Sequence, residues 1–145
     1  MKTILIIIWS SVIIIQSGTA KSDDVIIQVS GIDVARGGNI IVMIFDQDGF
    51  PKDHQKALYT QVKGATQTGM AFTFSLELGE MAVKVLHDEN KDGKVSKNWT
   101  GIYPKEGLGF TNDQQVSLLG PPKYQKSSVS KAQFKGGLTI SIIYP

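Results

Sequence analysis

The sequence predicts an all-β protein: a β-sandwich of about seven strands, with one long loop between strands five and six. Short segments rich in β-formers recur along the chain, separated by turns that contain glycine. Several of these segments alternate apolar and polar residues, as a strand with one buried face does. After the first twenty residues, no segment shows the apolar spacing of an amphipathic helix.

The first predicted strands occupy residues 25–29, 39–45 and 57–63. The first is a short β-rich run that ends at Ser30 and Gly31. The second, NIIVMIF, is apolar at both alternating sets of positions, which is typical of a central strand buried on both sides. The third alternates only weakly.

Residues 70–77 form the clearest strand, because apolar and polar positions alternate without a break. Residues 81–87 follow almost at once, so the two segments are expected to pair as a hairpin. One face of the earlier strand should be buried; its residues are Met70, Phe72, Phe74 and Leu76.

The last predicted strands are residues 128–134 and 138–144, joined by a turn at Gly136 and Gly137. In the final strand, Thr139 and Ser141 should face water. The residues expected to pack inward are Leu138, Ile140, Ile142 and Tyr144.

The N-terminus has the order of features found in a secretory signal peptide. Met1 and Lys2 precede an apolar run over residues 4–15, and small residues then allow cleavage after Ala20. The alternative is an uncleaved membrane anchor, but that run would rise only about 18 Å as a helix, against a hydrocarbon core of roughly 30 Å. We therefore expect a signal peptide over residues 1–20, a single domain over residues 21–145 with no membrane span, and a periplasmic or secreted location.

The composition argues against a nucleic-acid partner. The chain has 15 Lys and Arg against 13 Asp and Glu, whereas a nucleic-acid-binding domain usually carries a basic excess on one face. There is no cysteine, so the domain must be stabilised by its apolar core, without disulfide bonds.

The long loop begins with the spacing of a calcium-binding loop. Oxygen-bearing side chains stand at the first, third and fifth places, Gly93 at the sixth, and possible carbonyl and water-mediated ligands at the seventh and ninth. The twelfth place holds Trp99 instead of the bidentate glutamate. A metal-free turn is the alternative, because Asp and Asn bond to nearby backbone. The candidate ligands are Asp88, Asn90, Asp92, Lys94 and Ser96.

The rest of the loop combines aromatic side chains with glycine, proline and a carboxylate. Such a surface could stack on a sugar or hold a peptide; alternatively, Trp99, Tyr103 and Phe110 fold inward and anchor the loop. The candidate binding face consists of Trp99, Tyr103, Glu106, Phe110 and Tyr124.

The two histidines give no catalytic pattern. His87 and Asp88 are neighbours in an extended segment, so their side chains point to opposite faces. His87 is expected to bond to the loop, and His54 to be exposed.

The central block and its surroundings resemble a bacterial exported family called domain of unknown function 2141. The matching segments are residues 76–83, 87–94, 101–112 and 120–122, and the likeness extends over the region after the leader. The family pattern usually has an aromatic at position 81 and Asp at position 96, where this chain has Met81 and Ser96. The resemblance implies a transthyretin-like or carboxypeptidase-regulatory-like sandwich, and it supplies no catalytic residues.

Three functions remain open. The first is a non-catalytic module that binds a protein, peptide or glycan through the face formed by residues 88–124. The second is a metal-dependent hydrolase using Asp88, Asp92 and Glu106, which would be contradicted if Glu106 were bonded into the loop backbone. The third is a structural or assembly subunit of the cell envelope, whose sign would be a long unprotected edge strand.

Overall fold

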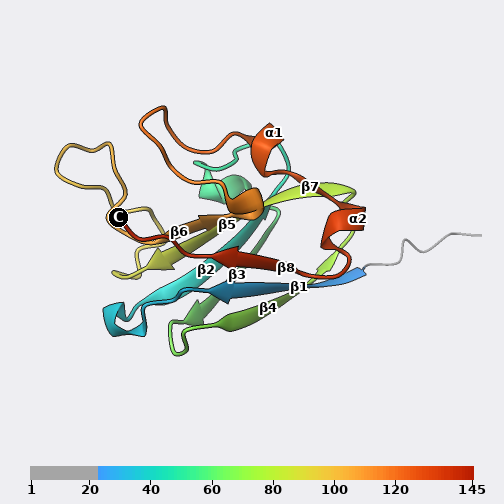
Figure 1. Cartoon of the computed structure of the whole chain (residues 1–145), viewed down its shortest axis with the longest axis horizontal. Helices are drawn as coiled ribbons and strands as arrows, with labels where there is room; N and C mark the ends of the chain where they lie inside the picture. Colours follow the sequence, from blue (N-terminus) through green and yellow to red (C-terminus); the bar gives the residue numbers. More distant parts are fainter. Residues whose placement is uncertain (1–22) are drawn as a thin grey trace, which may run out of the picture.

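The computed structural model describes residues 23–145, in which two β-sheets pack face to face (Figure 1). The signal peptide expected at residues 1–20 lies outside the described residues. Within residues 23–145, no helix is long and apolar enough to cross a membrane.

The first sheet has three strands in the order β4-β1-β8. The central strand β1 (Asp23–Ser30) runs antiparallel to β4 (Met70–Leu76) and parallel to β8 (Leu138–Ser141). The first and last strands of the described chain therefore lie side by side in this sheet.

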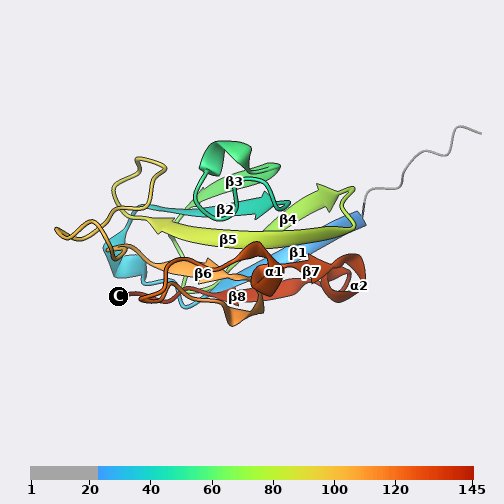
Figure 2. The same cartoon turned by 90° about the horizontal axis from the view of Figure 1, so that it is seen from above.

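The second sheet has the order β3-β2-β5-β6. Its central strands β2 (Asn39–Phe45) and β5 (Glu80–Asp88) are flanked by β3 (Tyr59–Gly64) and the short β6 (Leu108–Phe110). A two-residue strand, β7 (Val129–Ser130), pairs with the start of β5. Figure 2 shows β5 running the length of this layer.

Short helical turns connect the strands. They are η1 (Val34–Arg36), η2 (His54–Lys56), η3 (Thr111–Asp113), α1 (Tyr124–Ser127) and α2 (Lys131–Phe134).

The main core lies between the sheets and is built by the alternation read from the sequence. In β4, Phe72, Phe74 and Leu76 are buried, and the residues between them are exposed. Each large apolar side chain buried in this way contributes about 1.5–3 kcal/mol. Ile140 and Ile142 join the same core, with Thr139 and Ser141 exposed, as predicted.

A second apolar cluster covers the outer face of the five-stranded sheet. This is why β2 is apolar at every position after Asn39: alternate residues face the main core and the second cluster. The loops after β2 and β5 cover this face. The buried members of the cluster are Ile41, Met43, Phe45, Leu86, Leu108 and Phe110.

The all-β sandwich is confirmed, with eight strands in the described part, but two local predictions are wrong. β4 and β5 do not pair as a hairpin, because the short connection between them passes from one sheet to the other. Residues 128–134 form β7 and α2 instead of one strand, because Ser130 and Gln133 make a capping box that starts a helical turn.

The free edge of β4 is partly covered by side chains. The Lys63 ammonium donates a hydrogen bond to the Ala71 carbonyl, and the Gln61 amide donates to the Thr73 carbonyl, both at 2.6 Å. Lysines and occupied carbonyls discourage strand addition at an edge. This arrangement argues against an assembly role through β4.

Candidate functional site

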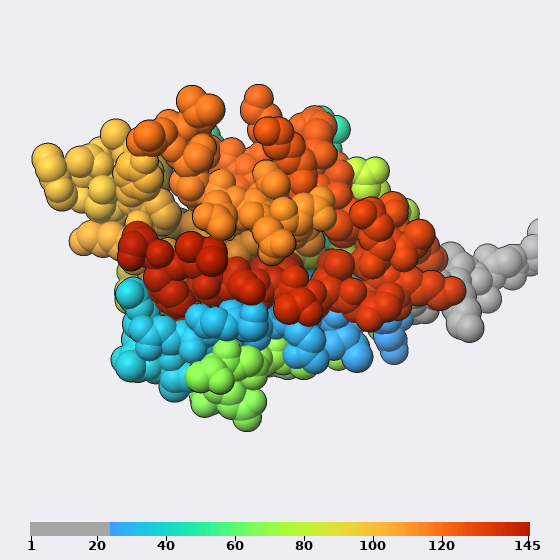
Figure 3. All heavy atoms as spheres, in the orientation of Figure 1, coloured from blue at the N-terminus to red at the C-terminus, as the bar shows by residue number. Residues whose placement is uncertain are grey.

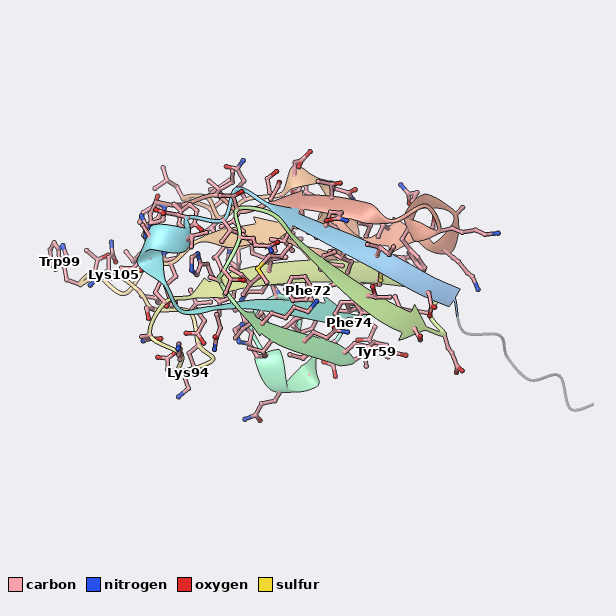
Figure 4. All side chains as sticks on the ribbon, turned by 90° about the horizontal axis from the view of Figure 1, so that it is seen from below. Tyr59, Phe72, Phe74, Lys94, Trp99 and Lys105 are labelled. Carbon is pink, nitrogen blue, oxygen red and sulfur yellow. The ribbon has the colours of Figure 1, made fainter. Side chains whose placement is uncertain are left out.

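An open pocket of about 620 Å³ lies on the outer face of the five-stranded sheet, between the segment around η2 and the loop after β5. The pocket falls in the size range of small-ligand sites. Figure 4 shows Lys94 on the loop beside it, and Figure 3 shows the loop after β5, in yellow, projecting from the body of the molecule. We call this cavity the Lys84 pocket. Its lining includes Pro51, His54, Lys84, Gly93, Val95, Ile102, Pro104, Leu108, Phe110, Val116 and Pro121.

Lys84 is a charged residue in the middle of a buried strand. It lies opposite Met43 of β2 and Phe110 of β6, so apolar residues flank it on both sides. The residue is 4% exposed. Burial disfavours the charged ammonium and lowers the pKa of Lys84 to about 8.

Two acceptors from the segment around η2 hold the Lys84 amine. It donates one hydrogen bond to the Pro51 carbonyl and one to His54 Nε2, each at 2.8 Å. An ammonium has three N–H donors, and within residues 23–145 no third acceptor and no carboxylate partner lies within bonding distance. Lys84 is thus a buried cation without a counter-ion in the described chain.

His54 joins the two walls of the pocket. Its Nδ1 lies 3.0 Å from the Gly93 carbonyl; since a carbonyl only accepts, Nδ1 carries the proton and Nε2 is free to accept from Lys84. Burial, and then the charge of Lys84, lower the pKa of His54 and favour this neutral form. The expectation that His54 is exposed is wrong, because the loop after β5 folds over it.

The rim of the pocket is positively charged. Lys52, Lys94 and Lys97 line it and make no ion pair within the described chain. Asp53 and Asp92 also line it, but their oxygens accept hydrogen bonds from Gln55 N–H and Lys94 N–H. Four lysines against two aspartates give the lining a formal charge of +2 with His54 neutral.

The predicted calcium-loop residues do come together. Asp88, which is 1% exposed, accepts hydrogen bonds from the Asp92 and Gly93 N–H groups, at 3.1 and 2.9 Å. The Asn90 amide lies 2.9 Å from Asp92 Oδ2 and 3.3 Å from Ser96 Oγ. Gly93 has a φ of +72°, which a side chain rarely adopts.

These contacts are those of an Asx-rich turn. Within residues 23–145, no three His, Cys, Asp or Glu side chains are grouped so as to hold an ion. A calcium ion here would depend on Asn90, Ser96 and backbone oxygens as well as Asp88 and Asp92, and calcium binding stays a prediction.

Glu106 is bonded into the loop backbone. Its carboxylate accepts from Glu89 N–H at 3.0 Å and from Ser96 N–H at 2.8 Å, and the residue is 3% exposed. This arrangement counts against the hydrolase hypothesis, because both carboxylate oxygens already accept hydrogen bonds from the loop backbone.

The predicted binding face is divided by the structure. Glu106 and Phe110 are buried, and of the two only Phe110 lines the Lys84 pocket. Tyr103 and Tyr124 are half-buried, whereas Trp99 is 95% exposed at the tip of the loop (Figure 4). Phe110 therefore folds inward as the anchoring alternative requires, and Trp99 does not.

His87 has a structural position in the main core. Since the Gly37 carbonyl only accepts, His87 Nε2 donates to it at 2.6 Å, which leaves Nδ1 to accept from the Tyr144 hydroxyl at 2.6 Å; the hydroxyl oxygen also accepts from Asp33 N–H at 2.9 Å. His87 thus bonds to the loop after β1 and to the C-terminal tail.

Tyr144→Phe is expected to lower the free energy of unfolding by about 1–2 kcal/mol, because Asp33 N–H and His87 Nδ1 both lose a partner. Urea denaturation followed by circular dichroism measures it. Tyr103→Phe is the matched control, since the hydroxyl of this half-buried tyrosine makes no hydrogen bond to the described residues. Equal losses in the two variants would contradict the role of the His87 network.

Sequence reasoning missed Lys84 and His54. One signal was present: in the segment MAVKVLH, Lys84 is the single charged residue in a buried strand. A lysine in that position needs partners from elsewhere in the chain, and the sequence does not show which loops supply them.

Comparison with known proteins places this fold in a family. No curated protein and no solved structure matches the chain. A model of the family DUF2141, described as an uncharacterized protein conserved in bacteria, matches residues 27–135, which include every residue of the Lys84 pocket. The chain belongs to the DUF2141 family.

Proposed function

We propose that this protein is an exported, non-catalytic binding module that takes a protein, peptide or glycan on the face formed by residues 88–124. The observation that carries the proposal is the Lys84 pocket, which opens on this face and is lined by apolar and cationic side chains. The periplasmic or secreted location rests on the leader-like residues 1–20.

The surroundings of the pocket favour a peptide over a glycan. Ile102, which lines the pocket, is 68% exposed, and exposed apolar side chains are what a protein partner covers. Trp99, the aromatic best suited to stack on a sugar, is not part of the pocket lining.

The test is a titration of the isotope-labelled protein with a mixture of short peptides and, separately, with a mixture of oligosaccharides. We expect the peptides to shift the amide signals of residues 52–55 and 92–103 in NMR spectra. Absence of shifts with both mixtures at millimolar concentration would overturn the proposal, and shifts with oligosaccharides alone would reassign the ligand class.

Two variants locate the binding surface within the face. Ile102 lines the pocket, whereas Leu119, which is also exposed, does not. Ile102→Asp should weaken peptide binding about 10-fold, and Leu119→Asp should change it little; neither should alter stability by more than about 0.5 kcal/mol. A larger loss of affinity in Leu119→Asp than in Ile102→Asp would show that the ligand binds outside the pocket.

We also propose that calcium binds the 88–96 loop and orders this wall of the pocket. The support is the convergence of the Asn90, Asp92 and Ser96 side chains, together with the weak affinity sufficient for an exported site, roughly 10⁻⁴–10⁻³ M.

Calcium at ten times its dissociation constant should stabilise the fold by about 1.4 kcal/mol, and so raise the melting temperature by about 4 °C relative to chelator. Asp92→Asn should abolish the shift. Asp113→Asn, at an exposed carboxylate outside the loop, should keep it. If the wild type melts identically with chelator and with calcium at about 10 mM, roughly ten times the weakest expected constant, calcium does not bind the loop.

A further inference from the structure

The Lys84 amine is held in place with part of its bonding capacity unused. Its two acceptors, the Pro51 carbonyl and His54 Nε2, belong to the same short segment. Neither carries a negative charge. Burying a cation without an opposite charge costs several kcal/mol. An anion bound next to Lys84 would offset part of this cost.

The walls around Lys84 restrict what kind of anion can reach it. Apolar side chains form much of the lining, among them Ile102, Leu108 and Val116. A ligand that fills this volume must therefore have an apolar body next to its charge. The rim lysines Lys52, Lys94 and Lys97 add a field that attracts anions to the opening.

The donor set fits a singly charged carboxylate better than a phosphate. Lysine binds phosphate as a point charge, and phosphate sites add arginine forks or several backbone N–H groups; no arginine lines this pocket, and Lys84 is its one buried cation. One buried ammonium with one unused N–H offers a single charge-assisted hydrogen bond, which matches one carboxylate oxygen.

We propose that the Lys84 pocket binds the carboxylate of an apolar ligand, with Lys84 donating its third N–H to a carboxylate oxygen. The carboxylate can belong to the free C-terminus of a peptide that ends in an apolar residue, or to a free organic acid. This inference rests on the proposed binding function and names the chemical class of its ligand.

The structural arrangement also predicts a coupling to protons. Above pH 8, part of the unliganded protein has lost the Lys84 proton. A bound carboxylate favours the charged amine, so binding at pH 9 takes up a proton. Other titratable or charged groups also face this pocket; they are His54, Asp53, Asp92, Lys52, Lys94 and Lys97.

The experiment compares charged and uncharged probes of equal shape by isothermal titration calorimetry. The probes are acetyl-Ala-Ala-Leu with a free carboxylate and its C-terminal amide, and nonanoate with nonanol. We expect each acid to bind about 10- to 100-fold more tightly than its uncharged partner. Preference for the peptide acid or for nonanoate identifies the source of the carboxylate.

Lys84→Met should reduce the affinity for the acids by the same factor and leave the amide and the alcohol unchanged. Lys135→Met is the matched control: it removes one exposed positive charge next to α2, at the end of the sandwich away from the loop after β5 (Figure 1), and should preserve the preference. If Lys84→Met does not fold, proton uptake by the wild type at pH 9, measured in buffers of different ionisation enthalpy, tests the same contact.

Three results would overturn the inference: equal affinity for acid and amide, unchanged acid binding in Lys84→Met, or no binding of either acid. The first two leave the binding function intact, because a ligand still occupies the face. If neither peptide probe binds and the NMR titrations show no shifts, the proposed binding function is contradicted as well.

Discussion

Glu106→Leu is expected to lower the free energy of unfolding by about 3 kcal/mol. The variant leaves the partly buried N–H groups of Glu89 and Ser96 without the carboxylate that accepts from both, and each unsatisfied donor costs about 1–3 kcal/mol when buried. Because Glu106 ties both ends of the 89–96 segment, the loss should be accompanied by faster amide exchange there. Urea denaturation and hydrogen exchange measure the two effects.

Glu77→Leu is the matched control for this change. Glu77 is exposed just after β4, and its carboxylate makes no hydrogen bond or ion pair with the described residues. The same substitution there should alter stability by no more than about 0.5 kcal/mol. A comparable loss at both positions would show that the loop does not depend on the Glu106 carboxylate.

Between pH 7 and pH 10.5, the free energy of unfolding of the wild type should rise by about 3 kcal/mol relative to that of Lys84→Met. The pKa of Lys84 falls from 10.5 in the unfolded chain to about 8 in the folded one. Between these values the unfolded chain binds more protons, so the free energy of unfolding of the wild type rises with pH, by about 1.4 kcal/mol for each pKa unit. Below pH 8 both states are protonated and this contribution is constant.

Urea denaturation of both proteins at half-unit pH intervals measures the effect. The comparison with Lys84→Met cancels the titration of groups that the two proteins share. Lys52→Met controls for the loss of one exposed lysine at the rim, and should change stability by about 0.5 kcal/mol or less at pH 7. A difference between the wild type and Lys84→Met that stays flat with pH would show that the Lys84 amine is solvated.

The two predictions depend on different parts of the same loop system. Glu106 holds the segment 89–96 in shape, and Gly93 of that segment accepts the hydrogen bond from His54. His54 in turn accepts from Lys84. Loss of Glu106 should therefore also weaken ligand binding, through displacement of the pocket wall.

Local patterns in the sequence were enough for most of the strands, but not for β6, which lies inside the predicted long loop, or for residues 128–134. The alternation over residues 70–76 and the unbroken apolar run of β2 depend on side-chain periodicity alone, and the structure confirms both. The unusual loop after β5 was also recognisable, because its Asp, Asn and Gly spacing specifies a turn within a few residues.

The tertiary structure alone decided which strands pair and which distant groups meet. Periodicity states that β4 has a buried face, but not that β4 pairs with β1 instead of β5. The Lys84–His54 contact joins residues 30 positions apart, and Trp99 is exposed because its loop extends away from the sheet. By itself the sequence determined a β-sandwich with a structured loop; the site depended on how two loops close over one buried lysine, which is set by long-range packing.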